Sequence, residues 1–318
     1  MAPRRLLIDT DPGVDDTMAI LLALASPEVQ VEGLTVVFGN TDVEQCARNA
    51  LAVLEVAGRP DLPVAVGAGR PLLRPYTGRG RQVHGADGLG ETGLGAGRPV
   101  PDRNAVEFLI ARAREAPGEL TVLALGPLTN LALAVSVEPR LARWVREVVL
   151  MGGGVRDRGN ATPVAEANVH NDPESARIVL HAGWPVTMVG LDVTHRVIMT
   201  PAHLERLTAA RTPVTELIGA ITPFYLRAAR QFAGIDGFFV HDPTAVTYLL
   251  RPEWFTTQAL YVDVVTDSER ARGQTIADFR GQWGQPPNVR VCLEVDAERE
   301  LAFYLERVTA YRPGTARP

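Results

Sequence analysis

The part of this sequence with the clearest chemical potential is a cluster of four aspartates, Asp9, Asp11, Asp15 and Asp16. They follow the apolar run Leu6–Ile8 and enclose a Pro–Gly pair, the pattern of a buried parallel strand that ends in a turn. Open α/β sheets bind ligands at such strand ends. Close carboxylates repel one another, and burial raises that cost, whereas a hard cation ligated by oxygen removes it. The spacing therefore predicts a metal site. The alternative is a solvated loop in which Asp15 or Asp16 caps the next helix.

A second polar segment follows the triple glycine Gly152–Gly154. Glycines at a strand end let the backbone pass close to a ligand or to another loop. Asn160, Glu166 and Asn168 come next, and amide and carboxylate groups suit the hydroxyls of a polyhydroxylated ligand. The segment is thus either part of a binding site or a polar surface loop.

Two histidines have a context that suggests chemistry. His241 precedes Asp242-Pro243, where a helix is expected to begin, and follows the apolar Phe238–Val240. We interpret this pair as the edge of an apolar pocket, the alternative being a packed histidine beside a plain N-cap. His84 lies in a glycine-rich loop. The other histidines are interpreted as structural: His170, His181, His195 and His203.

Composition and missing residue types exclude several functions. The 318 residues are 46% hydrophobic with a net charge of −5, which argues against a nucleic-acid or anionic-membrane surface. All 32 basic residues are arginine, so lysine Schiff bases and P-loop lysines are excluded. No serine lies in Gly-x-Ser-x-Gly. Gly88–Gly93 fits Gly-x-Gly-x-x-Gly, but no strand precedes it, which favours a loop over a dinucleotide site.

The expected location is the cytoplasm. The first residues run directly into a strand with no visible signal peptide, and no apolar stretch reaches the roughly 18 residues of a membrane span. Cys46 and Cys292 form no Cys-x-x-Cys motif, which is typical of reduced thiols.

Apolar runs alternate with helical patterns through the first two-thirds of the chain, which predicts an α/β fold. We expect an open, mostly parallel twisted sheet with helices on both faces. The predicted strands are Leu6–Asp9, Val31–Phe38, Val64–Val66, Leu120–Leu125, Glu147–Met151 and Val186–Val189. The predicted helices between them are Val43–Ala57, Asn104–Glu115, Leu128–Val135 and Pro173–His181.

The remainder of the chain has a different pattern. It is mostly helical from Pro201 to Phe232, followed by a loop at Ala233–Phe239. A small antiparallel extension and a last helix are expected at the end, over Gln258–Val265, Val289–Val295 and from Ala297. The stretch Gly67–Asp102 is interpreted as a long loop, and loops of that length tend to be functional or mobile. No repeat or linker is visible, so we predict one domain over residues 1–318.

The sequence resembles the calcium-dependent nucleoside hydrolases, the inosine–uridine-preferring N-ribohydrolases, from Leu6 through the final helix. The matching motifs, in order, are Asp9-Thr10-Asp11-Pro12-Gly13-Val14-Asp15-Asp16, Val37-Phe38-Gly39-Asn40, Leu125-Gly126-Pro127-Leu128-Thr129-Asn130, Val149–Gly154, Gly159-Asn160, Glu166-Ala167-Asn168, Asp172-Pro173-Glu174 and His241-Asp242-Pro243.

The resemblance implies a Rossmann-like core and hydrolysis of ribonucleosides to ribose and free base. It implies Ca²⁺ ligands at Asp11, Asp16, the carbonyl of Leu125 and Asp242, with Asp11 also taking a proton from the metal-bound water. It implies ribose contacts from Asp15, Asn160, Glu166 and Asn168, a wall at Met151, an orienting role for Asn40 and an acid role for His241. Asp9 would lie behind the ligands. The implied partner is a small nucleoside, and the implied assembly is a homodimer or homotetramer.

This chemistry agrees with the residue types. Ribosyl C–N cleavage passes through an oxocarbenium-like state, as glycoside cleavage does. Ca²⁺ binds carboxylates, water and hydroxyls together, the metal lowers the pKa of its water, and a carboxylate completes the deprotonation. The base leaves more easily when it is protonated, which calls for a histidine.

The preferred base is less well marked. The purine-preferring pattern has Phe where this chain has Ala167, and Ala229 replaces a tyrosine one turn after Tyr225. We therefore lean towards pyrimidine nucleosides such as uridine, with His84 sharing the acid role. A purine-preferring or non-specific hydrolase is the alternative.

Two more distant alternatives belong to other classes. An aspartate-based phosphatase also begins with a strand followed by Asp-x-Asp. Such enzymes usually have Thr or Val where this chain has Gly13, and they need a lysine, which this chain lacks. A catalytically dead nucleoside sensor would be expected to lose the base or a metal ligand, yet Asp11, Asp16 and Asp242 are all present.

Overall fold

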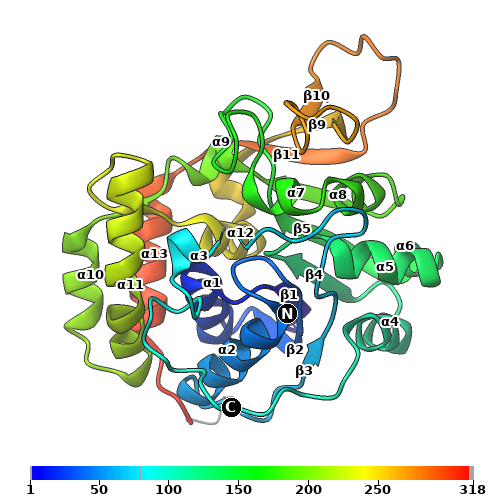
Figure 1. Cartoon of the computed structure of the whole chain (residues 1–318). Helices are drawn as coiled ribbons and strands as arrows, with labels where there is room; N and C mark the ends of the chain where they lie inside the picture. The colour runs from blue at the N-terminus through cyan, green and yellow to red at the C-terminus, as the bar shows by residue number, and fades with distance from the viewer. Residues whose placement is uncertain (1, 79, 315–318) are drawn as a thin grey trace.

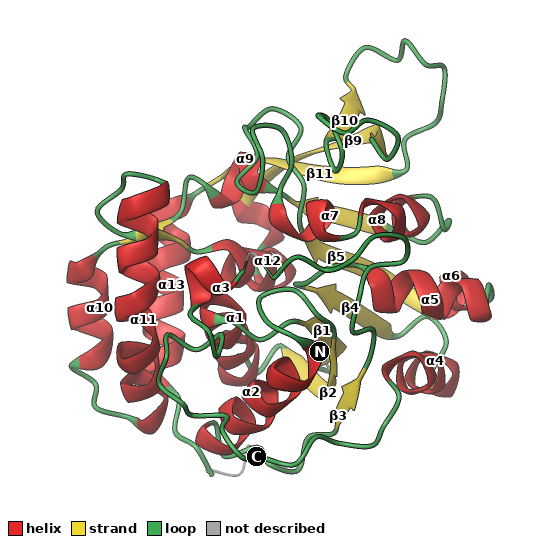
Figure 2. Cartoon of the chain, viewed as in Figure 1, coloured by secondary structure: helices red, strands yellow, loops and turns green. Residues whose placement is uncertain are grey.

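A central β-sheet carries the structure (Figures 1 and 2), a computed structural model that describes residues 2–78 and 80–314. Its parallel strands are β1 (Arg4–Thr10), β2 (Val29–Val36), β3 (Val64–Val66), β4 (Leu120–Ala124), β5 (Val145–Met151) and β6 (Val186–Val189). Each lies within two residues of its predicted position at both ends. The central residues of these strands are mostly Val, Leu and Ile, which is typical of strands covered on both faces.

The strand order is β3-β2-β1-β4-β5-β6, which is the doubly wound order of dinucleotide-binding folds. The order in which strands are added to the sheet reverses at β1: β2 and β3 lie on one side of it, and β4 to β6 lie on the other. Ile8 on β1 is in register with Leu34 on β2 and with Leu123 on β4. Ligands bind at the carboxyl ends of the strands beside such a reversal. Asp9 lies near the end of β1, and Asp11, Asp15 and Asp16 follow the strand at this place.

Helices cover both faces of the sheet, because successive side chains of a strand point to opposite sides. Leu6 and Ile8 belong to one buried cluster, whereas Leu7 belongs to the other. The first cluster packs under α1 (Val14–Ala25), α2 (Val43–Val56), α10 (Pro201–Thr208), α11 (Pro213–Phe232), α12 (His241–Leu250) and α13 (Ala297–Ala310). The second packs under α4 (Ala105–Glu115), α5 (Thr129–Val137), α6 (Leu141–Trp144) and α8 (Pro173–Leu180), on the other side of Figure 1.

The predicted antiparallel extension is present and continues the main sheet. β11 (Val289–Val295) pairs in parallel with β6 and antiparallel with β9 (Phe255–Val264), and β10 (Thr275–Asp278) forms the edge. Together they bring the sheet to nine strands among the described residues. β10 had no strong sequence signal because it has four residues and lies at an edge.

One predicted loop is partly wrong. Phe238–Phe239, expected within a loop, forms strand β8, which pairs antiparallel with β7 (Ile198–Met199). Two-residue strands are too short for apolar alternation to reveal them. The short helices α3 (Arg81–His84), α7 (Ala167–Asn171) and α9 (Leu191–Thr194) and the 3₁₀ turn Pro252–Trp254 were missed for the same reason. In the described part of the chain, no helix combines the length and apolarity needed to cross a membrane.

Candidate active site

The acidic cluster is buried at the carboxyl ends of β1, β2 and β4. Carboxylate oxygens of Asp15, Asp16 and Asp242 lie within 4.8 Å of one another. Asp11 is 1% exposed, and one of its oxygens, Oδ1, has no hydrogen-bond partner among the described residues. The same holds for Oδ1 of Asp15. The fold therefore brings together acids that are more than 200 residues apart in sequence.

Hydrogen bonds hold Asp11 Oδ2 and both carboxylate oxygens of Asp16. The Asn40 backbone N–H donates to Asp11 Oδ2 at 2.7 Å, and its side-chain amide donates to Asp16 Oδ2 at 2.8 Å. Thr10 Oγ1 donates to Asp16 Oδ1 at 2.5 Å, and Gly13 N–H to Asp16 Oδ2 at 3.0 Å. Asn40 thus fixes two acids at once, and Asp16 belongs to the first turn of α1 while facing the cluster.

Two motif glycines are explained by Asp11. A Cβ on Gly39 would overlap Asp11 Oδ2, and one on Gly126 would lie 2.5 Å from Asp11 Oδ1. Any side chain at either position would displace the carboxylate. The sequence motifs contain these glycines, but spacing alone does not reveal which side chain they accommodate.

Electrostatics supports a cation at this place. Burial, followed by repulsion from Asp16, raises the pKa of Asp11 well above its usual range. Burial, followed by Asp15, raises the pKa of Asp242 in the same way. Buried ionised carboxylates with unpartnered oxygens are costly unless a positive charge is supplied. An all-oxygen donor set of this kind fits a hard divalent cation, and the cluster can therefore hold a metal.

The carbonyl of Leu125, which follows β4, also lies in this region. It accepts a hydrogen bond from Asn168 Nδ2 at 2.7 Å, and the same amide donates to the carbonyl of Met151 at 3.2 Å. A carbonyl oxygen has two lone pairs, so this contact leaves one for another partner. Leu125, Asn168 and Met151 are thereby brought together at the ends of β4 and β5.

Glu166 and Asn160 mainly shape their own loop. Glu166 accepts the backbone N–H groups of Asn168, Gly153 and Val169 at 2.8 to 3.0 Å and caps α7. Its charge contributes to the raised pKa of Asp242, which places it near the acids. Asn160 is exposed, and its Oδ1 accepts the N–H of Ala167 at 2.9 Å. Sequence reasoning gave both residues a ligand-facing role and missed this one.

His84 reaches the acids from the long loop after β3. Its Nδ1 accepts the N–H of Val14 at 3.1 Å and lies 3.7 Å from Asp15 Oδ1. Its ring centroid is 5.1 Å from that of Tyr225, whose hydroxyl donates to Asp15 Oδ2 at 3.2 Å. Burial lowers the pKa of His84 to about 4, so the ring is neutral near pH 7.

The same loop is packed onto the residues after β2. Tyr76 Oη donates to the carbonyl of Gly39 at 2.6 Å, and a Cβ on Gly80 would lie 2.5 Å from Cα of Asn40. These contacts explain how a segment with little regular structure presents His84 at a defined position. Tyr76 had no sequence signal beyond its presence in the loop.

His241 lies beside Asp242 at the start of α12. Its Nδ1 is 2.8 Å from Oγ1 of Thr194, and the rings of Phe239 and His195 each have their centroid 5.7 Å away. Burial, followed by the charges of His195 and His84, lowers the pKa of His241 to about 3. Thr194 was not considered from the sequence, and His195 was interpreted as structural, yet both contact His241; their place after β6 is where site residues are expected.

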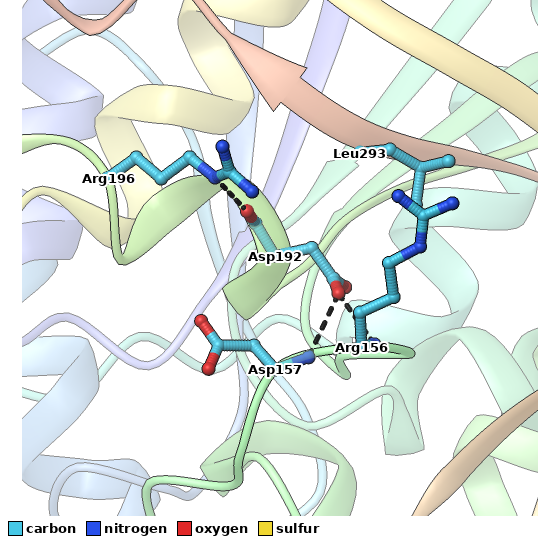
Figure 3. A pocket seen from close by; sticks show the side chains of 5 residues that line it. All are labelled: Arg156, Asp157, Asp192, Arg196 and Leu293. Atoms are coloured by element: carbon cyan, nitrogen blue, oxygen red, sulfur yellow. Dashed lines mark hydrogen bonds between the residues drawn. The ribbon is translucent and has the colours of Figure 1, made fainter.

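A separate cavity lies under the loop that leads to Asn160 (Figure 3). It measures about 280 Å³ and is lined by Arg156, Asp157, Asp192, Arg196 and Leu293. The Asp192 carboxylate accepts the backbone N–H groups of residues 155–157 at 2.7 to 3.1 Å. None of the clustered acids lines this cavity. The acidic cluster is the group of residues that can hold a metal, and it is therefore the candidate active site.

Comparison with known proteins agrees with this geometry. The profile of the inosine-uridine preferring nucleoside hydrolase family matches residues 6–302. A probable uridine nucleosidase 2 from Arabidopsis thaliana is 39% identical over 315 residues, which cover 96% of this chain and 97% of that protein. The plant nucleoside hydrolase PpNRh1 has a TM-score of 0.93 at 38% identity, and a purine-preferring ribonucleoside hydrolase from Gardnerella vaginalis has 0.91 at 32%; each covers 97% of this chain and 99% of the other.

The family profile spans almost the whole chain, and relatives above 30% identity match it nearly from end to end. The strand order and the buried acids at its reversal point are those that the resemblance led us to expect. This chain therefore belongs to the inosine-uridine preferring nucleoside hydrolase family and is a hydrolase of nucleosides.

Proposed function

We propose that this enzyme cleaves the N-glycosidic bond of ribonucleosides with the help of Ca²⁺ held by Asp11, Asp16, Asp242 and the carbonyl of Leu125. The observation that carries this proposal is the buried acidic group in which oxygens of Asp15, Asp16 and Asp242 lie within 4.8 Å of one another, together with the unpartnered Asp11 Oδ1. When bound, the cation would lower the pKa of an attacking water and neutralise the acids.

Asp11 is proposed as the base that takes the proton of the water. Its Oδ2 accepts the Asn40 N–H at 2.7 Å, which holds the carboxylate in one orientation. A base held in one orientation needs no reorganisation during the reaction. Asn40 is accordingly proposed as the residue that orients Asp11 and Asp16.

Ribose is proposed to bind between Asp15 and Asn168. Asp15 Oδ1 is buried without a partner, and a ribose hydroxyl would satisfy it. Met151 would form an apolar wall for the sugar. Glu166 and Asn160 are proposed to contribute to this side, and their observed contacts support a role in holding the loop in shape.

His241 is proposed to donate a proton or hydrogen bond to the leaving base, with His84 as a second donor. Both rings are neutral near pH 7, and a neutral imidazole still offers one N–H. Because His84 accepts at Nδ1, its proton is expected on Nε2. Removing this assistance should matter only when the leaving group needs it.

For the base, we propose pyrimidine nucleosides, uridine first. Ala167 and Ala229 leave this side less aromatic than the purine-preferring pattern, and the Arabidopsis relative is a probable uridine nucleosidase. The Gardnerella structure, described as purine-preferring, is the reason to keep inosine as the second candidate.

The test is ribose release from uridine, cytidine, inosine and adenosine, before and after exhaustive chelation. We expect chelation to abolish activity and added Ca²⁺ to restore it. D11N should lose about 10²–10⁴-fold in kcat while remaining folded, because a positioned base contributes that much. D61N, at an exposed aspartate, is the matched control. Full activity in chelated enzyme would exclude the metal mechanism, and a clear preference for inosine would exclude the pyrimidine assignment alone.

A further inference from the structure

Thr194, at the end of α9, is in direct contact with the ring of His241. Its Oγ1 lies 2.8 Å from His241 Nδ1, although the two residues are 47 positions apart. Thr194 is fully buried. A buried hydroxyl aimed at an imidazole nitrogen is a specific contact, because both groups would be costly to bury unpaired.

The backbone of α9 is anchored on several sides. Thr194 N–H donates to the carbonyl of Gly190 at 3.1 Å, and Leu191 N–H donates to that of Gly153 at 2.9 Å. Asp192, in the same turn, receives the three N–H groups of the loop at residues 155–157, as Figure 3 shows for two of them. The Thr194 hydroxyl is therefore presented from a fixed support.

The segment that carries His241 is tied to the same support. β8, which leads to His241, pairs with β7, which follows α9. Val240 N–H then donates to the carbonyl of Val197 at 3.0 Å. Backbone pairing thus sets the distance between the two segments, and the Thr194 contact adds control over rotation of the His241 ring.

The chemistry of this contact suits either form of the ring. A hydroxyl rotates to donate to an unprotonated Nδ1 or to accept from a protonated one. In both cases Nδ1 is engaged, and Nε2 remains the nitrogen that can meet a leaving group. Orientation of one imidazole nitrogen by a partner on the other is a common device in catalytic histidines.

We propose that Thr194 is a positioning residue for nucleoside hydrolysis, whose hydroxyl fixes the ring of His241 so that Nε2 faces the leaving base. This inference rests on the proposed acid role of His241. It assigns a function to α9, which no sequence motif indicated.

The decisive comparison uses substrates with different leaving groups. T194V removes the hydroxyl with little change of shape, and we expect roughly a tenfold loss in kcat for uridine, as for one lost hydrogen bond. The kcat for p-nitrophenyl riboside, whose leaving group needs no proton, should fall at most twofold, as expected for a substitution that does not affect the reaction. T194S should recover most of the loss on uridine. T247V removes a buried hydroxyl of α12 that donates to Pro243 and serves as the matched control, with no leaving-group dependence expected.

H241A separates failure of this inference from failure of the proposed function. If H241A is selective for uridine but T194V is not, the inference is overturned and the acid role stands. If H241A harms both substrates equally, the acid role itself is wrong. T194V should add nothing in the H241A background, and an added selective loss there would also overturn the inference. Histidine ¹⁵N resonances provide a readout independent of activity: T194V or T194A should shift His241 Nδ1, and an unchanged resonance would contradict the proposed contact.

Discussion

At the scale of single residues, the site is organised around Asp11 and its neighbours. The carboxylate has one oxygen bound by Asn40 and one without a partner, and two glycines leave it room. Spacing in the sequence was sufficient to predict that Asp11 and its neighbours share a site, because four acids at one strand end are hard to explain otherwise. It was not sufficient to predict which atom of each acid is occupied.

The glycine beside Asp11 leads to a first prediction. G39A should reduce both activity and stability, because its Cβ would overlap Asp11 Oδ2 and such overpacking costs about 1–3 kcal/mol. Ribose-release assays and thermal unfolding would measure both effects. G69A is the control, since its Cβ would meet only Val43 Cγ1 at 3.3 Å. If G39A and G69A behaved alike, the role of Gly39 in accommodating Asp11 would be wrong.

Recognition of ribose leads to a second prediction at this scale. The buried, unpartnered Asp15 Oδ1 would remain unpaired with a substrate that lacks the 2′-hydroxyl. A site built for a hydroxyl rejects the deoxy analogue by on the order of 10⁴-fold. Values of kcat/KM for uridine and 2′-deoxyuridine test this directly. Similar values for the two would show that the base, and not the sugar, is the main determinant of binding.

The site residues that could not be predicted from the sequence were missed for one physical reason. Thr194 and Tyr76 act through contacts with residues far away in the chain, and no local pattern records such contacts. Glu166 is the opposite case. Its side chain was predicted to contact the ligand, but its carboxylate accepts hydrogen bonds from backbone N–H groups of its own loop. The residue type therefore predicts which hydrogen bonds a side chain can make, whereas the fold decides which groups it bonds.

At the scale of elements, the start of α12 is supported from the C-terminal helix. Glu300 on α13 is 1% exposed, and its Oε1 lies 2.6 Å from Thr244 Oγ1. The same hydroxyl lies 2.5 Å from the carbonyl of Val240. One hydroxyl has one proton, so both contacts are satisfied only if Glu300 supplies a proton of its own. Burial raises the pKa of Glu300 to about 8, against the opposing effect of Thr244.

This arrangement predicts a pH-dependent contribution to stability. The unfolded chain releases the Glu300 proton near pH 4.3, and the folded chain releases it only near about 8. The folded state thus binds the extra proton between these values, and its stability from this group falls as the pH rises through them. E300Q cannot titrate, so its stability relative to wild type should increase from pH 5 to 8, by at most about 1.4 kcal/mol per pH unit.

Urea unfolding of both proteins at several pH values measures this difference. E298Q removes an exposed charge from the same helix and is the matched control. A gap between wild type and E300Q that stays constant from pH 5 to 8 would mean that Glu300 is ionised in the folded enzyme.

Elements were predicted well where local pattern decides them. Val64–Val66 and Val186–Val189 are apolar runs, whereas Val289–Val295 has a buried apolar centre with exposed Arg290 and Glu294. The predicted bounds of all three strands are confirmed. β7, β8 and α9 have two to four residues and exist because of pairing with distant segments. These short elements carry or support His241, so the part of the site on the leaving-group side was the least predictable.

At the scale of the whole molecule, the strand order explains why one site collects residues from the entire chain. β1 and β4 lie side by side at the reversal point, and α12 packs against α1 and β5 there. The predicted fold class is confirmed by this order. The expectations of a single domain over residues 1–318, a cytoplasmic location and a homodimer or homotetramer stay predictions.

Binding of the cation should therefore stabilise the entire fold. The acids that it would neutralise come from the turn after β1, from the start of α1 and from α12, so an unfolded chain cannot present them together. A ligand that binds only the folded state stabilises it by about 2.7 kcal/mol at a concentration 100 times its Kd. We expect Tm to rise steadily with Ca²⁺ concentration in chelator-treated enzyme, without nucleoside present.

The variant D242N should lose most of this Tm increase, because it removes the proposed ligand that connects α12 to the acids between β1 and α1. D61N, which leaves the cluster intact, should retain it. Since Tm is measured without turnover, the result tests cation binding separately from catalysis. A Tm that does not respond to Ca²⁺ in the wild-type enzyme, while activity still depends on it, would place the functional cation away from Asp242 and would require a different ligand set.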